Sequence, residues 1–264
     1  ISLGHNALFA IGAYTTAIAT SWYGWGSVPA TLLAIVVTCL VALVVGIPTL
    51  RLKGYYLAIA TLGFAYIVTS LIKTQYFGGS SGITNIPRLT VVSYTFASDV
   101  SYYYLVWFVL FGAIVTGLRI GETALGRSMK AIHTDEDAAA CMGIDVARTK
   151  IEAFVFSAAF AALAGALYAQ YGGIISPTSF DIMLSVKLVL MLYLGGVGTV
   201  YGGVFGALLL FVLPEFLGRF EKFELMLEGL IFLFILMFAP RGLIGGLHYV
   251  RRAFFRQSIQ WNVP

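Results

Sequence analysis

Charged residues are scarce in this chain of 264 residues, because Lys, Arg, Asp and Glu together make up only 11% of it. Apolar residues make up 59%, and the mean hydropathy is +0.91. A soluble domain has roughly 25% charged residues, so this chain has too few charges to keep a surface of its size in water. The scarcity excludes a water-soluble globular protein and predicts a membrane protein.

Groups that catalyse reactions or bind metals are also few and unpaired. The two cysteines lie in different settings, Cys39 in an apolar run and Cys141 in a polar loop. The three histidines lack metal-ligand spacing, and neither a Gly-Lys-Ser/Thr phosphate loop nor a nucleophile with an adjacent base is present. We therefore expect that the chain is not an enzyme and holds no cofactor and no metal.

The net charge of +4 does not indicate a nucleic-acid partner. Membrane proteins have excess Lys and Arg in their cytoplasmic loops, and this bias alone explains the value.

Long apolar segments dominate what is present. A transmembrane helix needs about 17–25 residues, and an alternating strand pattern is absent. Unpaired backbone groups in hydrocarbon cost several kcal/mol each, so we predict an all-α, polytopic transmembrane helix bundle forming a single domain over residues 1–264. Seven segments are interpreted as full spans and one as a short, broken or re-entrant helix: residues 3–20, 28–50, 55–72, 102–118, 151–171, 204–217 and 225–239, and the broken segment 182–194.

The apolar run is already under way at Leu3, and Met is absent from the start. We therefore expect one or more N-terminal helices to be missing. Most Lys and Arg residues fall on one side when the segments alternate across the membrane. This places the 119–150 loop and the basic tail 241–264 in the cytoplasm and the 74–101 loop outside.

The 119–150 loop holds five of the 16 Lys and Arg residues and predicts a short helix. Thr134 and Asp137 have the spacing of a capping box, and Gly143 is placed to end the helix in a left-handed conformation. About two turns are too short to persist alone in water. The helix therefore either enters a groove on a partner or is a packed amphipathic linker, and the spacing leaves both open.

Two glycine clusters also allow two interpretations. Gly195, Gly196 and Gly198 interrupt a span, which suits either a pathway hinge or tight helix packing. The Gly-Ser run at 78–82 in the outer loop is either flexible against a binding protein or a plain loop.

Several stretches, in order along nearly the whole chain, resemble the LivM-type permeases of bacterial ABC importers for branched-chain amino acids. In the 119–150 loop the matching positions are Gly126-Arg127, Ala131-Ile132, residues 135–139 and Met142-Gly143-Ile144. The others are residues 2–5 and 12–14, 50–63, 78–87, 150–165, 195–204 and 240–245.

The resemblance implies a permease subunit in the bacterial inner membrane. Its partners would be a homologous LivH-type permease, two ATP-binding subunits of the LivG and LivF type, and a periplasmic or lipid-anchored substrate-binding protein. The short helix would be the coupling helix seated on an ATPase, and the glycine cluster (Gly195, Gly196, Gly198) would serve the pathway or a hinge. The coupling residues would be Arg127, His133, Glu136, Ala139, Ala140 and Gly143.

The family usually has arginine where His133 stands, so we expect a weaker or pH-sensitive basic contact there. The alternatives are a permease for urea or short amides and, from another class, a secondary transporter or channel. The last predicts carboxylates in mid-span and an internal repeat, neither of which the sequence has.

Overall fold

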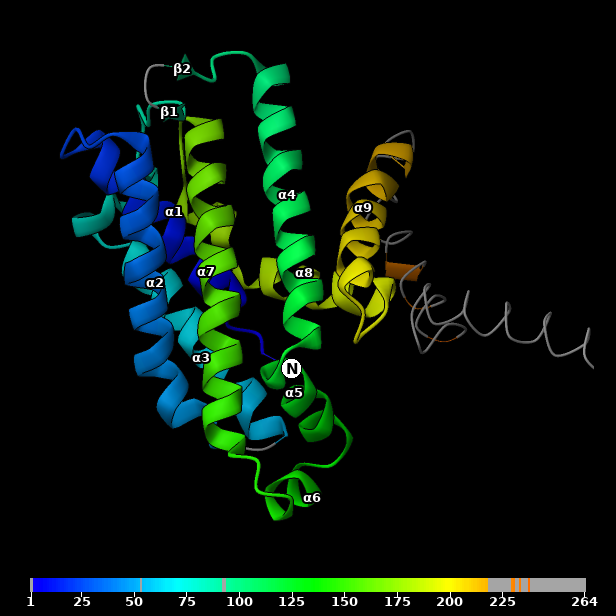
Figure 1. The fold of residues 1–264 in the computed structure, drawn as a ribbon. Helices are drawn as coiled ribbons and strands as arrows, with labels where there is room; N and C mark the ends of the chain where they lie inside the picture. The colour runs from blue at the N-terminus through cyan, green and yellow to red at the C-terminus, as the bar shows by residue number, and fades with distance from the viewer. Residues whose placement is uncertain are drawn as a thin grey trace, which may run out of the picture. The chain divides into compact units, whose positions relative to one another are not determined.

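The computed structural model describes residues 2–52, 54–91, 94–217, 229, 230, 233 and 237, and helices dominate this part of the chain (Figure 1). The all-α fold class is confirmed. The helices are α1 (His5–Ser21), α2 (Ser27–Thr49), α3 (Tyr55–Ile72), α4 (Asp99–Glu122), α5 (Ala124–Thr134), α6 (Glu136–Cys141), α7 (Val146–Gly172), α8 (Ile182–Gly195) and α9 (Val200–Leu217). Short 3-10 turns and a two-stranded hairpin complete it: η1 (Gln75–Phe77), η2 (Gly79–Ser81), η3 (Pro177–Phe180), β1 (Thr90–Val91) and β2 (Tyr94–Thr95).

Within the described residues, four helices, α2, α3, α4 and α7, are long and apolar enough to cross a membrane. The predicted spans over α4 and α7 were too short, because both helices continue past their apolar middles into polar turns. The predicted broken helix is present: α8 and α9 bend by 118° at their junction, as in a broken span or a re-entrant loop. The expected span 225–239 lies mostly outside the described residues, and the expected tail 241–264 lies wholly outside them.

The chain divides into two compact units, residues 1–185 and 186–264. The expectation of one domain over residues 1–264 stays a prediction.

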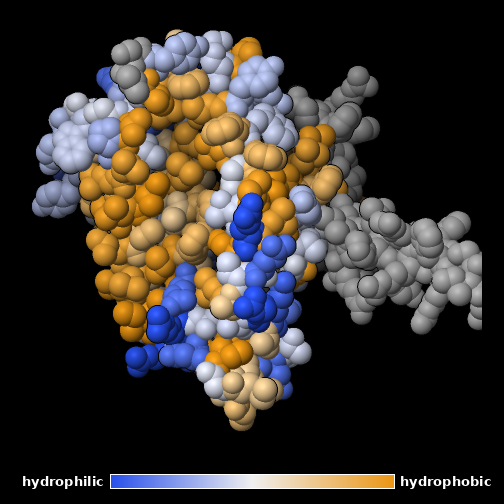
Figure 2. Space-filling model, in the orientation of Figure 1, coloured by the Kyte–Doolittle hydropathy of each residue, from blue (hydrophilic) through white to orange (hydrophobic). Residues whose placement is uncertain are grey.

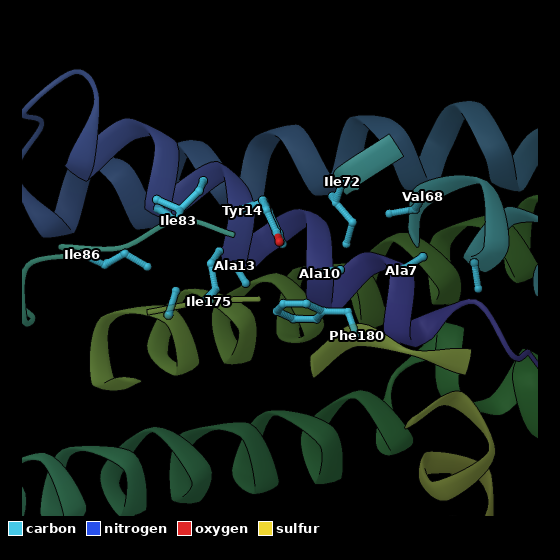
Figure 3. Packing of buried hydrophobic residues seen from close by; sticks show 13 residues of the cluster. Ala7, Ala10, Ala13, Tyr14, Val68, Ile72, Ile83, Ile86, Ile175 and Phe180 are labelled. Atoms are coloured by element: carbon cyan, nitrogen blue, oxygen red, sulfur yellow. The ribbon is translucent and has the colours of Figure 1, made fainter. Parts of the chain in front are cut away.

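In the first unit α1 is the central helix and packs against α2, α3 and α7. Its alanines at positions 7, 10, 13 and 17 recur every three or four residues, the spacing of one helix face, and are fully enclosed. They pack with Val68 of α3, Ile175 and Phe180 in a single cluster (Figure 3). Small residues on this face let larger neighbours come close.

A close approach of backbones joins α1 to α7. A Cβ on Gly12 would lie 2.5 Å from the Cα of Ala162, and a Cβ on Gly165 would clash with the carbonyl of Phe9. Helices in lipid associate by close packing of such small residues. This contact therefore requires glycine for space at one position on each helix.

The described residues of the 74–101 segment are tied to the rest of the bundle by hydrogen bonds. Ile83 and Ile175 exchange two backbone hydrogen bonds of 2.9 Å, so the segment is joined to the chain that follows α7. The Ser27 hydroxyl at the start of α2 accepts a hydrogen bond from the Thr90 N–H (3.1 Å). Gly82 has a positive φ of 75°, and a side chain there would clash with the Ile175 carbonyl. The geometry explains this glycine, while a contact of the 78–82 run with a binding protein stays a prediction.

Polar and apolar surfaces are separated along the first unit. Figure 2 shows apolar side chains over the middle of α2 and α7, while hydrophilic side chains gather toward the α5–α6 end. The 74–98 segment joins α3 to α4, and α5–α6 joins α4 to α7, so the two connections lie at opposite ends of α4. This arrangement is what a membrane-spanning bundle needs.

Candidate functional site

The predicted polar loop contains two helices, and the first of them, α5, was missed by the sequence analysis. Thr123 ends α4 and starts α5, because its hydroxyl donates to the Ile120 carbonyl (2.7 Å) and accepts from the Gly126 N–H (3.3 Å). The i, i+4, i+7 spacing of Leu125, Met129 and Ile132 was the signal available for this helix. It was overlooked because neighbouring charges make the segment polar overall.

Two cations of α5 fold back on the end of α4. Arg127 donates to the Glu122 carbonyl (2.8 Å), and the Lys130 ammonium donates to the Gly121 carbonyl (3.1 Å). The last carbonyls of a helix lack partners within the helix, and cations there also suit the helix dipole. Arg127, expected to contact an ATPase, thus has a structural role within the chain as well.

Gly126 makes the sharp turn between α4 and α5 possible. A Cβ at this position would lie 2.7 Å from two backbone atoms of Gly121 and would clash with the Ile120 carbonyl. The glycine that forms part of the family motif is therefore required here by space.

The start of α6 differs from the prediction. Asp135 is the N-cap, and its carboxylate accepts from the N–H groups of Asp137 (2.9 Å) and Ala138 (3.0 Å). Thr134 instead ends α5, and its hydroxyl donates to the Lys130 carbonyl (3.1 Å). The proposed capping box was wrong because α5 already occupies Thr134, which moves the cap one residue along the chain.

The end of α6 is as predicted. Gly143 has a φ of 84° and lies in the left-handed region. The Gly143 N–H donates to the Ala140 carbonyl (3.0 Å), and the Ile144 N–H donates to the Ala139 carbonyl (3.1 Å). These two hydrogen bonds form a Schellman motif. The helix has six residues, close to the two turns expected, and Met142 is its C-cap.

One face of α6 is turned toward α7. Glu136 accepts a 2.8 Å ion-pair hydrogen bond from Lys150 of α7, and Ala139 is only 4% exposed. Because Ala139 faces inward, it is not available on the surface, although sequence analysis grouped it with the contact residues.

The opposite face of α6 is open. Ala140 and Gly143 are exposed, as are Cys141 and Met142, whose exposed fraction is 83%. His133, at the end of α5, is exposed too. The loop thus ends in a small apolar tip with polar surroundings, a surface suited to docking on another protein rather than to covalent chemistry.

The second candidate feature, the glycine cluster, lies at the bend between α8 and α9. A Cβ on Gly195 would clash with the Gly202 carbonyl, and one on Gly206 would clash with the Met191 carbonyl. The two helices therefore pack backbone against backbone. Thr199, which lies in the 195–204 stretch matching the family, caps α9 by accepting from the Gly202 N–H (3.1 Å).

Gly196 and Gly198 give the bend its backbone conformation. Their φ angles are 121° and 90°, in the region that favours glycine. Tight packing at Gly195 is observed, whereas a role of the cluster as a hinge or pathway stays a prediction. Among the described residues, no group of three or more His, Cys, Asp or Glu could hold a metal ion.

Comparison with known proteins identifies a family whose sequences match this chain. The family described as "Branched-chain amino acid transport system / permease component" matches residues 1–239. The high-affinity branched-chain amino acid transport system permease protein LivM of Salmonella typhimurium is 34% identical over 92% of this chain and 63% of its own length. LivM of Escherichia coli K12 is 33% identical over the same shares.

More distant relatives include a second kind of permease. The LivH permease protein of Escherichia coli K12 is 28% identical over 53% of the chain and 46% of its own length. No solved structure matches the chain. The chain spans 63% of the length of its LivM relatives, and the matched family covers the polar loop and the glycine bend alike. This multi-pass membrane chain therefore belongs to the permease component family of branched-chain amino acid transport systems.

Proposed function

We propose that the chain is a permease subunit of an ATP-driven importer for branched-chain amino acids in the bacterial inner membrane. It forms the translocation pathway with a homologous permease similar to LivH. Two ATP-hydrolysing subunits bind on the cytoplasmic side, and a substrate-binding protein delivers the amino acid outside. The names of its relatives support the substrate class.

The observation on which the coupling role rests is the open tip of α6. A helix of six residues does not persist alone in water, since isolated helices below about 12 residues are marginal. Here caps at both ends and one enclosed face hold it together, while Ala140 and Met142 stay exposed. A rigid, small-residue tip suits a groove on an ATPase, and so α6 is assigned as the coupling helix.

The substrate is tested in a complex reconstituted in proteoliposomes with its partner subunits. ATP-dependent uptake of radiolabelled leucine is expected, without uptake of urea. Uptake of urea but not leucine would favour the urea or short-amide importer. Leucine uptake by the chain alone, without ATPase subunits, would instead favour a secondary transporter.

The coupling role is tested by Ala140→Trp, which enlarges the exposed tip without touching the enclosed face of α6. Substrate-stimulated ATP hydrolysis and uptake should fall together, because the enlarged side chain does not fit the groove. Ala147→Trp is the matched control, since Ala147 is exposed in the first turn of α7, outside the tip. Equal activity of the two variants would reject α6 as the docking element.

A further inference from the structure

The ion pair between Glu136 and Lys150 differs from the other described ion pairs by its enclosure. Its side chains are 29% and 20% exposed, against 77% and 45% for Arg148 and Glu152. Exposed pairs are weakened by solvent and salt, whereas enclosed pairs are screened much less. This pair also joins two helices, while Arg148 and Glu152 lie within a single helix, four residues apart.

The pair and the buried alanine fasten the same face of α6. Glu136 and Ala139 are three residues apart, so their side chains lie on one side of the helix. Beside Lys150, Thr149 of α7 is 8% exposed and donates to the Asp145 carbonyl (2.8 Å), which ties the first turn of α7 together. The inner face of α6 therefore rests on an ordered helix start.

From Lys150 onward α7 runs as one continuous helix to Gly172, without an internal proline. Further along it meets α1 at the Gly12 and Gly165 contact, where backbone lies against backbone. Closely packed helices transmit displacement because the interior has little free space. A fixed attachment at the start of α7 is thus sufficient to link α6 with the centre of the bundle.

We propose that Lys150 is a positioning residue for coupling: its bond to Glu136 holds α6 in register on α7, so that movement of the docked tip displaces α7 and, through it, α1. The proposal rests on the coupling role of α6. It adds the residue that connects α6 to the bundle, which pairs with the inner face of α6 and not with its exposed tip.

The test measures amino acid taken up per ATP hydrolysed in the reconstituted transporter. Glu136→Gln and Lys150→Met each remove the ion pair between α6 and α7, and the ratio should fall roughly tenfold because α6 is then no longer held in register on α7. The exchange variant Glu136→Lys with Lys150→Glu should recover more than half of the wild-type ratio. A purely local packing role would not produce this recovery.

Arg148→Met is the matched control, because it removes an exposed cation two residues away on the same helix. Its ratio should stay within about twofold of wild type, as exposed pairs contribute little. A wild-type ratio in Lys150→Met, or an exchange variant no better than the single variants, would overturn the proposal.

If a variant fails to assemble with its partner subunits, hydrogen exchange of the purified chain tests whether Lys150 holds α6 in place. The amides of α6 should exchange faster in Lys150→Met than in Arg148→Met, and equal rates would overturn the proposal. The coupling role itself is checked separately by crosslinking exposed Cys141 of the wild-type chain to an ATPase subunit. Absence of that crosslink would reject the proposed function, whereas a crosslink with unchanged Lys150→Met ratios would reject the positioning role alone.

Discussion

Glycine serves different purposes at different positions in this chain. At Gly165 and Gly12 a side chain would meet the backbone of the facing helix. At Gly112, in the middle of α4, an added Cβ would have nothing within 4 Å. The abundance of glycine, 29 residues, predicted close helix packing, but composition alone does not say which glycines make the contacts.

The variant Gly165→Ala should destabilise the purified chain by about 1–3 kcal/mol, the usual cost of overpacking a tight interface. The change is measured as a lower melting temperature in detergent. Gly112→Ala, with open space around the new methyl group, should melt at or slightly above the wild-type temperature. Equal effects of the two variants would show that α1 and α7 can move apart at no cost.

Local residue patterns predicted the end of α6 and failed at its start. A glycine with positive φ depends only on its immediate neighbours, so Gly143 could be identified from sequence. The cap depended on whether the preceding residue was still helical, and that followed from α5 being anchored on α4 by Arg127 and Lys130. These long side chains reach five and nine residues back, beyond any capping pattern.

The capping assignment is tested by Asp135→Ala, which removes the acceptor for two N–H groups of α6. The local stability of α6 should fall by about 1 kcal/mol, the typical cost of losing an N-cap. Hydrogen exchange of the α6 amides measures this. Thr134→Ala should leave those amides unchanged, and a larger effect at Thr134 would restore the capping box first predicted.

The bend between α8 and α9 provides a pair of neighbouring glycines for comparison. Gly206→Leu places a side chain against the Met191 backbone, whereas Gly203→Leu meets nothing within 4 Å of its Cβ. We expect Gly206→Leu to reduce both the yield of folded protein and uptake, and Gly203→Leu to leave the yield unchanged. Normal yield with slow uptake in Gly206→Leu would favour a hinge over packing.

At the scale of the whole molecule, hydropathy predicted the helical bundle and the candidate spans α2, α3, α4 and α7, whereas the predicted span 3–20 lies on α1, which is not a candidate span. Composition was sufficient for the bundle because hydrocarbon permits only structures with internally paired backbone groups. It could not predict how the 74–101 segment is held, because its hydrogen bonds link Ile83 with the distant Ile175. Contacts between residues so far apart in the sequence leave no local pattern, and the same is true of Glu136 with Lys150.

The orientation of the molecule gives a prediction of its own. Cys141 is exposed on α6, so a membrane-impermeant maleimide should label it in inside-out vesicles and not in intact spheroplasts. A cysteine introduced at exposed Tyr76 of η1 should show the opposite pattern. Labelling of Cys141 from outside would reverse the assignment made from the Lys and Arg distribution.

If α6 docks on an ATPase as proposed, the attachments of α7 have a consequence for how movement is passed across the membrane. Helix α7 has 27 residues and is about 40 Å long at 1.5 Å per residue. It is held near its start by the ion pair of Lys150 and just beyond its end at Gly172 by the pairing of Ile175 with Ile83. A helix held at both ends transmits a displacement from either end to the other. Substrate delivery on one side and ATP hydrolysis on the other would then act on the bundle through the same helix.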